Sequence, residues 1–501
     1  MPNIIEAHPE YERWEDTWIR QRDLIDGEDV VKKKGPIYLP LLEGQAYTAG
    51  FPGETPVVSS YTSYKNRATF LNATGRTLNG LVGLVMRKKI SITWPGDQDF
   101  LKRAGRYSES FNEVAQKTLD EVVGVGRFGH LVDTPSAGGS PYIAEYITED
   151  ILDWEEADVN GTRKLVMIKL REWRYYRTSK DERKRVADYR ILRLGVPTRL
   201  DAVEGMSLDD SLASNLVPDD FINGPVYFQE IWRYTEFETE KEKVVLTDII
   251  VPRRTGGSVL HDIPFTFFNP TSTKAKPEKP VLLDLAVVNL SHYRNSADLE
   301  HGAHFTALPQ PWASGFKFKN DQMFIGSGVA WVTDEKGASA GYLEFTGAGL
   351  GFLKSLMEDK KKEMAAMGAR LLEEQTPSGN AEATQTVKLR QSGERSVLAR
   401  VSLSVSEGLT KSLGFCAWFL NEDQESVKVV LNSDFGTEGL SGDQLRALME
   451  AVLNGHLSWN TFMWNARLGE IIPDDVTDED EAARITAGPP LLPMTTGTIE
   501  E

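Results

Sequence analysis

The stretch that decides the fold is TQTVKLRQSGERSVLARVSLSVSEGLTKSLGFCAWFL, residues 384–420. Its apolar residues recur at helical spacing, which predicts a single helix roughly 55 Å long. Small residues such as Ser402 and Gly408 are interleaved with Val405 and Leu409. A helix of this length is hard to bury on both faces within one chain, so the pattern favours packing between neighbours, including across subunits.

Two more helices are expected ahead of this one. The first spans 281–305 and is stopped by Pro309 and Pro311, and the second spans 350–372. Residues 374–383, EQTPSGNAEA, then have the composition of a mobile loop. The segment between the two helices contains three short strand-like pieces, at 312–318, 328–333 and 341–345.

The rest of the chain mixes helices with a sheet, so the expected fold class is α+β. Helices are predicted over 9–21, 61–87 and 109–123, and the alternating stretches that follow predict an antiparallel or mixed sheet. The strand-like stretches are 128–132, 142–146, 165–173, 189–194, 226–234 and 244–251. The chain closes with a strand at 427–431, helices at 442–453 and 459–468, and an acidic segment at 474–481.

Residues 124–129, GVGRFG, formally match the spaced glycines of dinucleotide-binding proteins. That function needs a strand before the glycines and a helix after them. Here a predicted helix precedes and a predicted strand follows. The run is therefore interpreted as a tight turn from helix to strand.

The charge of the chain limits its relation to nucleic acids. Its 501 residues carry 74 acidic and 56 basic side chains, a net charge of -18. Tight nucleic-acid binders usually carry an excess of Lys and Arg, because these neutralise phosphates. The balance argues against a conventional DNA-binding protein, but it is compatible with a conduit along which a duplex has to slide.

The sequence lacks three features of membrane or secreted proteins, and this indicates where the protein is made. No stretch approaches the apolar length of a membrane span, and residues 1–6 do not begin a secretory signal. The one cysteine, Cys416, allows no internal disulfide and is expected to be a buried, inert thiol. We expect a protein made in the cytoplasm.

The sequence offers little chemistry. It lacks a phosphate-binding loop, the HExxH and GxSxG motifs and a zinc pattern, so no catalytic residue, cofactor or metal is assigned and the protein is not expected to be an enzyme. One cluster leaves two interpretations open, a divalent metal site or, more plainly, polar helix packing. It consists of His292, Asp298, His301 and His304.

Five short patterns occur in a fixed order along the chain. They are YTSYKNRATFLN at 61–72, GLVGLVMRK at 80–88, GRFGHLVD at 126–133, YITEDILDW at 146–154 and IPF at 263–265. Each is weakly specific alone. In this order and spacing, the chain resembles the portal proteins of tailed bacteriophages from about residue 8 to residue 480.

The resemblance implies a portal layout for this sequence. It assigns an N-terminal arm and wing to 1–280, and a clip between two stem helices. It further implies a tunnel loop, a long wing helix with a return strand, a helical crown and a disordered tail. The two stem helices are 281–305 and 349–371, and the clip between them is 306–348. The tunnel loop is 372–383, and the long wing helix with its return strand is 384–440. The crown is 441–485 and the disordered tail is 486–501.

The resemblance also implies functional residues. The tunnel loop would include Gln375, Thr376, Pro377, Ser378, Gly379 and Asn380, and its residues 376–380 would protrude into the channel and touch DNA. Lys362 lies opposite the apolar stripe of its helix and is the first candidate for a ring of cations facing the channel, ahead of Lys360, Lys361 and Arg370; ordinary surface or ion pairs between subunits are equally compatible. The clip aromatics would bind partners or close a small sheet between subunits. They are Trp312, Phe316, Phe318 and Trp331.

A portal of this kind forms a ring, in the family a dodecamer, at one capsid vertex of the virion. Double-stranded DNA is packaged and ejected through it. The expected partners are the large terminase, a head-to-tail adaptor, the major capsid protein and a scaffolding protein, with no membrane. The alternatives are another head-tail connector or minor head protein, and an enzyme acting on nucleic acid, for which no acid-metal constellation is present.

Overall fold

The computed structural model is a mixed α+β protein in two compact units, Met1–Ser433 and Asp434–Glu501. It describes residues 6–42, 60–135, 139–159, 161–177, 182–195, 225–235, 243–254, 256–307, 310–316, 330–343, 347–368, 381–433, 435, 442–468, 471–472 and 478–486. Among the helices described, none has the length and apolar character needed to cross a bilayer.

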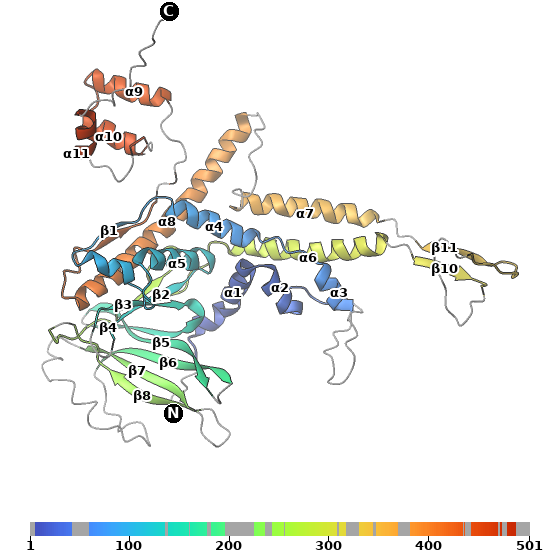
Figure 1. Ribbon diagram of the computed structural model, residues 1–501, viewed down its shortest axis with the longest axis horizontal. Coiled ribbons are helices and arrows are strands. Elements are labelled where there is room, and N and C mark those ends of the chain that lie inside the picture. The colour runs from blue at the N-terminus through green and yellow to red at the C-terminus, as the bar shows by residue number, and fades with distance from the viewer. Residues whose placement is uncertain are drawn as a thin grey trace, which may run out of the picture. The chain divides into compact units, whose positions relative to one another are not determined.

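Two antiparallel sheets organise the larger unit (Figure 1). The sheet predicted as antiparallel or mixed is antiparallel, but the strands Ser91–Thr93 and Phe265–Phe268 were missed, and so was β4. Its register shifts at Ile151/Asp153 and Glu155/Glu156 interrupt the alternation on which sequence prediction depends. The larger sheet orders β4 (Ile151–Val159), β5 (Thr162–Arg177), β6 (Arg183–Gly195), β7 (Val226–Thr235) and β8 (Lys243–Ile250), and the smaller orders β3 (Tyr142–Ile147), β2 (Phe128–Asp133) and β9 (Phe265–Phe268).

A tight turn joins helix α5 (Phe111–Gly124) to β2, as predicted from the glycine run. The helix begins at a capping box between Ser110 and Glu113. At the turn Gly126 has a φ of 93°, and a Cβ there would lie 2.8 Å from Pro280 Cα. Only glycine fits both the backbone conformation and this close approach.

The turn delivers the fully buried Arg127 into a stack of rings. Its guanidinium lies 4.4 Å from the centroid of the Trp154 ring and 4.6 Å from that of Phe267. His8 stacks on the other face of Trp154 at 4.2 Å. One guanidinium N–H donates to the Ala275 carbonyl at 2.5 Å. The stack ties the start of the chain to both sheets.

The prediction of one helix over 61–87 was wrong. The chain forms α3 (Ser60–Arg67) and α4 (Ala73–Met86), with a break between them. The Asn72 side chain caps α4 by accepting from the Gly75 N–H at 2.8 Å. Asn289 accepts from the N–H groups of Ala73 and Thr74, both at 3.1 Å. Capping from a residue far along the chain competes with helix continuity.

Helix α1 (Pro9–Asp26) runs five residues beyond the predicted end at Gln21. It stops at Gly27, which has a φ of 101°, and α2 (Glu28–Lys34) follows directly. The first helix contacts α4 and α6, and its Trp18 and Leu24 are fully buried, so residues 9–26 belong to the core of the larger unit.

A long arm projects from the sheets (Figure 1). It consists of α6 (Leu283–Ala307) and α7 (Ala348–Ala366), side by side, with paired strands β10 (Gln310–Ser314) and β11 (Ser339–Leu343) at its far end. The predicted extension of α7 to residue 372 was wrong, because the helix ends before Gly368, whose φ is 121°. The described part of the predicted strand 328–333, residues 330–333, is not a strand.

The deciding stretch forms α8 (Ala381–Phe419), one helix of 39 residues, as predicted. Its second half is buried in its own chain rather than left for a neighbour. A Cβ on Gly408 would lie 2.4 Å from the Phe268 ring. His130 on β2 contacts Thr118 Oγ1 at 2.9 Å and Ser412 Oγ at 3.3 Å, joining α5 and α8. Cys416 is fully buried, as expected.

The C-terminal end of the larger unit returns to its N-terminal half. After α8, the strand β12 (Lys428–Val430) pairs antiparallel with β1 (Ser91–Thr93). Ser406 donates to the Ser402 carbonyl and accepts from the Leu431 N–H, which fixes the returning strand on the helix.

The smaller unit is helical, and consists of α9 (Gly442–Leu453), α10 (Trp459–Leu468) and α11 (Asp478–Thr486). The first two helices agree with the prediction. The third was missed, because its acidic sequence was interpreted only as a charged segment. The core of this unit is Phe462, Met463, Ala466 and Ile472.

Candidate functional site

The arm contains the side chains that sequence analysis assigned to a channel. Helix α7 packs on α6 through Met364, which is buried against Leu285 and Ala73. Leu353 and Met357 are partly buried, as the predicted stripe requires. The predicted stripe also included Met367 and Leu371, but Met367 is 40% exposed and lies beyond the helix, so the stripe ends earlier than predicted.

The three consecutive lysines of α7 point in different directions, as expected. Lys360 turns towards α6 and donates to Ser291 Oγ at 2.7 Å; burial lowers its pKa. Lys361 and Lys362 face solvent, and each pairs with the carboxylate three residues before it, Glu358 at 3.0 Å and Asp359 at 3.8 Å. The Lys362 side chain is 75% exposed, the most of the pair. Lys362 is thus the more exposed of these two cations, and its place at a channel stays a prediction.

The polar residues of α6 are engaged in helix packing. Tyr64 on α3 donates to Asp298 Oδ1 at 2.6 Å, and the His301 ring meets the Tyr64 ring edge-on at 5.2 Å. His292 is 3% exposed, and burial together with Lys361 and Lys360 lowers its pKa. In the described part of the chain, no three metal-binding side chains come together.

The tip of the arm displays aromatic and apolar side chains. Trp312 on β10 is 45% exposed and lies opposite Gly341 on β11. Phe316 and Trp331 meet edge-on at 6.3 Å. Tyr342 and Val332 are 60% and 85% exposed, and sequence reasoning did not single them out. Tyr342 lies on a sheet too short for alternation to show which positions are exposed, and Val332 lies outside any strand.

Several predicted residues lie outside the described part of the chain. These are Arg370, Phe318 and the tunnel-loop residues Gln375, Thr376, Pro377, Ser378, Gly379 and Asn380.

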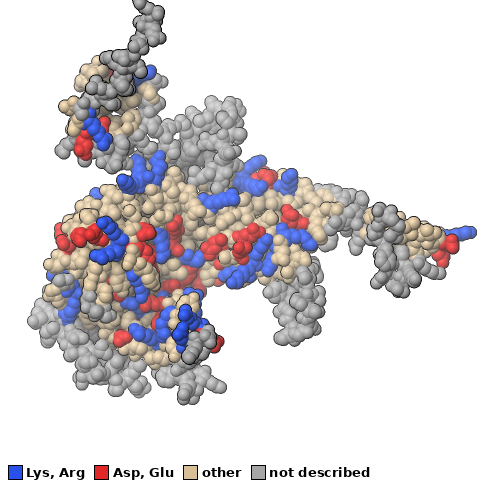
Figure 2. Space-filling view, in the orientation of Figure 1, with Lys and Arg blue, Asp and Glu red and all other residues tan. Residues whose placement is uncertain are grey.

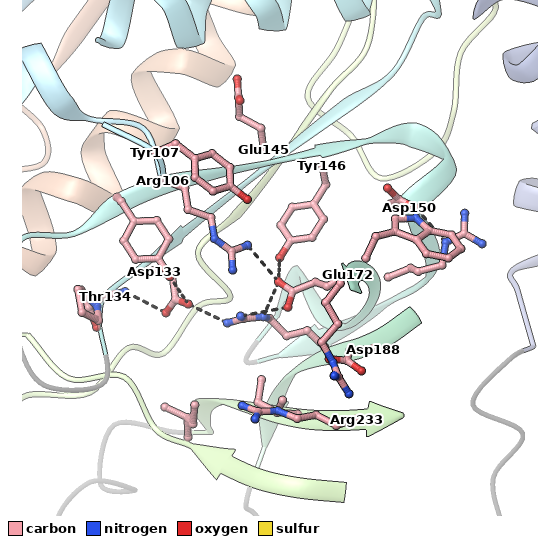
Figure 3. Close-up of a pocket in the computed structure, with 18 residues that line it drawn as sticks. Arg106, Tyr107, Asp133, Thr134, Glu145, Tyr146, Asp150, Glu172, Asp188 and Arg233 are labelled. Carbon is pink, nitrogen blue, oxygen red and sulfur yellow. Dashed lines mark hydrogen bonds and ion pairs between the residues drawn. The ribbon is translucent and has the colours of Figure 1, made fainter. Parts of the chain in front are cut away.

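A polar pocket of about 600 Å³ lies between the two sheets (Figure 3). Arg190 on β6 is at its centre. It donates to Asp133 Oδ2 at 2.8 Å, to Glu172 Oε1 at 3.1 Å and to Gln229 Oε1 at 2.7 Å. Tyr146 donates to the same Glu172 oxygen at 2.6 Å. The network joins β2, β3, β5, β6 and β7 through side chains that sequence analysis did not identify.

Charge in this pocket is balanced within the chain. Burial acts to raise the pKa of Glu172, but Arg190, Tyr146 and Arg106 outweigh it and hold the pKa below its usual range. Burial acts to lower the pKa of Arg190, and Tyr146, Glu172 and Asp133 raise it instead. Both groups are locked in their charged forms, which suits a joint between sheets rather than proton transfer.

One family model matches part of the chain. It is described as a domain of unknown function, DUF4055, and it covers residues 281–420. In the structure this range runs from the start of the arm to the end of α8. No curated protein matches the chain.

The chain is distantly similar to solved structures. The neck of a native gene transfer agent particle, computed with C12 symmetry, has a chain of 11% identity and TM-score 0.37, covering 78% of this chain and 88% of that one. The virion of a native gene transfer agent particle has a chain of 11% identity and TM-score 0.35, and the match covers 86% of this chain and 95% of that one. The neck of an empty particle, computed with C6 symmetry, has a chain of 12% identity and TM-score 0.38, and the match covers 83% of this chain and 95% of that one.

Proposed function

We propose that this chain is a portal protein, which assembles into a ring at one capsid vertex of a phage-like virion. Double-stranded DNA would be packaged and ejected through that ring. The large terminase and a head-to-tail adaptor would dock in turn at the tip of the arm, and the chain would perform no catalysis of its own. Capsid and scaffolding proteins would surround the ring.

The observation that carries this proposal is the exposed apolar surface of the arm. Val287 on α6 is 50% exposed and Phe352 on α7 is 69% exposed, although the two helices already pack on each other. Apolar side chains on both helices of a projecting pair lower their free energy by packing against neighbouring copies. A repeated contact of this kind closes into a ring with the arms around its axis.

The test is the size and shape of the purified chain. Mass photometry should find particles near the mass of twelve 55.9 kDa chains, about 670 kDa, and negative-stain images should show rings with a central hole. A stable monomer would contradict the proposal.

A pair of variants tests whether the arm makes the contact. Phe352→Glu places a charge on the exposed face and should leave folded monomers or small oligomers. Tyr107→Glu alters an aromatic residue that is 81% exposed on a turn outside the arm, and should leave rings intact. Rings of unchanged yield in Phe352→Glu would remove the arm from the assembly contact.

A further inference from the structure

One face of the β5–β6 hairpin carries cations that pair with no carboxylate in the part of the chain that the structure describes. The two strands contain eleven Lys and Arg against two Asp and Glu, a net charge of +9 within a chain of -18. Figure 2 shows Lys and Arg gathered over the lower part of the larger unit, where the end of this hairpin lies. Seven of the eleven cations form ion pairs with carboxylates, and the end of the hairpin carries Arg177, Arg183 and Arg185 in addition.

The register places these cations on one side of the sheet. Tyr175 is paired with Arg185, and Arg177 with Arg183, so the four side chains share a face. Trp173, two residues before Tyr175, lies on the same face, where it is 42% exposed and Tyr175 is 72% exposed. We call this set, Trp173, Tyr175, Arg177, Arg183 and Arg185, the arginine face.

The arginine face is built at a cost to the fold. Arg177 and Arg183 are directly opposite each other, and like charges in such a pair destabilise a sheet. Neither forms an ion pair with a described carboxylate, whereas Arg190 and Arg174, on the other side of the same strands, pair with Glu172 and Asp188. An anion bound from outside would offset the repulsion between the two guanidinium groups.

Trp173 holds part of this face ready for a ligand. The Arg185 guanidinium lies 4.0 Å from the centroid of its ring. The indole N–H donates to Asp150 Oδ1 at 3.0 Å, and Asp150 also accepts from Arg171. A guanidinium that rests on a fixed ring keeps its N–H groups free and loses less entropy on binding a planar anion.

We infer that the arginine face binds the phosphate backbone of double-stranded DNA. The choice of DNA as the polyanion rests on the proposed function, which brings the chain into contact with a duplex. Rows two residues apart on a strand are separated by about 7 Å, so several phosphates can be engaged together. Contacts to about three phosphates give weak, sequence-independent binding that is lost as salt rises, and such binding lets DNA move.

Fluorescence anisotropy with a short labelled duplex tests the inference on the full chain. The logarithm of the binding constant should fall with the logarithm of salt concentration with a slope of about -2.7, for about three phosphates. Arg177→Gln/Arg183→Gln should reduce the slope to about -0.9 and weaken binding roughly tenfold or more at about 50 mM salt. The same variant should melt no lower than the wild type, because it removes a repulsive pair.

The matched control is Arg103→Gln/Lys428→Gln, which removes two exposed positive charges elsewhere and should retain the wild-type slope. Equal loss in both variants, unchanged binding in the hairpin variant, or no binding at about 50 mM salt would overturn the inference. Tighter binding of a deca-glutamate peptide than of the duplex would assign the face to an acidic protein and also overturn it. Ring formation is scored separately by imaging, so either proposal can fail alone.

Discussion

Two arginines, Arg190 largely buried and Arg127 fully buried, lie in regions of the larger unit that treat charge in opposite ways. Arg190, in the pocket between the sheets, is surrounded by Asp133, Glu172 and Gln229. Arg127, in the ring stack at the α5–β2 turn, has two aromatic faces and one carbonyl, and burial lowers its pKa to about 9. Arg190 belongs to a set of opposite charges that balance one another. The charge of Arg127 is retained although burying it destabilises the fold. Burial alone therefore does not tell which charges stabilise this fold.

The largest effect is expected from removing the cation of the pocket. Arg190→Met would leave the buried Asp133 without an ion-pair partner among the described residues and Glu172 with Arg106 alone, and should lower the free energy of unfolding by about 3 kcal/mol. Denaturant unfolding of the full chain at neutral pH measures this. Arg193→Met, which breaks the exposed pair with Glu230 on the same strand, is the control and should cost under about 1 kcal/mol. If the two variants lost equal free energy of unfolding, the Arg190 contacts in the pocket would contribute no more than an exposed ion pair.

Removing the cation of the ring stack should raise the free energy of unfolding, where removing that of the pocket lowers it. Arg127→Met keeps much of the side-chain volume and removes a buried charge that has no carboxylate. After the loss of the hydrogen bond to Ala275, the free energy of unfolding should rise by about 1 kcal/mol. A fall of more than about 1 kcal/mol would show that the contacts with Trp154 and Phe267 outweigh the cost of burial.

Asp120 on α5 extends the comparison to carboxylates. Burial, with the nearby Glu121, raises its pKa from 3.8 to about 6. Because the folded state holds this proton more tightly, the contribution to stability is present below about pH 4 and is lost as pH rises towards about 6. Discounted for partial exposure, Asp120→Asn should add about 1 kcal/mol to the free energy of unfolding at pH 7, and nothing near pH 4.

Glu172→Gln should change the free energy of unfolding with the opposite pH dependence to Asp120→Asn. Its carboxyl has a lowered pKa, so its contribution is present above the unfolded pKa and is lost as pH falls through the folded one. The substitution should destabilise the chain at pH 7 and have less effect in acid. Matching pH profiles for the two variants would contradict the assignment of partners in the pocket.

The sequence predicted those elements whose signals are local. The turn at Gly126 follows from glycine spacing, and the 39-residue α8 follows from its periodicity. The break between α3 and α4 could not be predicted, because Asn289, more than 200 residues away, caps the second helix. β4 was missed because two bulges interrupt its alternation.

The candidate sites follow the same division. The orientation of Lys360 to Lys362 follows from helical geometry, and the structure agrees with it. The pocket was not foreseen, since Asp133 and Arg190 meet across 57 positions of sequence. The arginine face needed the strand register, because Arg177 and Arg183 become neighbours only when the hairpin pairs.

The pairing of β1 with β12 has a consequence for how the chain is made. Ser91 lies opposite Val430, so this small sheet cannot form on a ribosome until nearly all of the larger unit has been synthesised. In the folded chain α8 contacts β2 and β9 and β12 follows α8, so closing the long Ser91–Val430 loop carries a large entropy cost. A nascent chain that stops before Lys428 would keep the core of the sheets but lack this closure, so arrested or truncated chains should be sensitive to proteases at both strands.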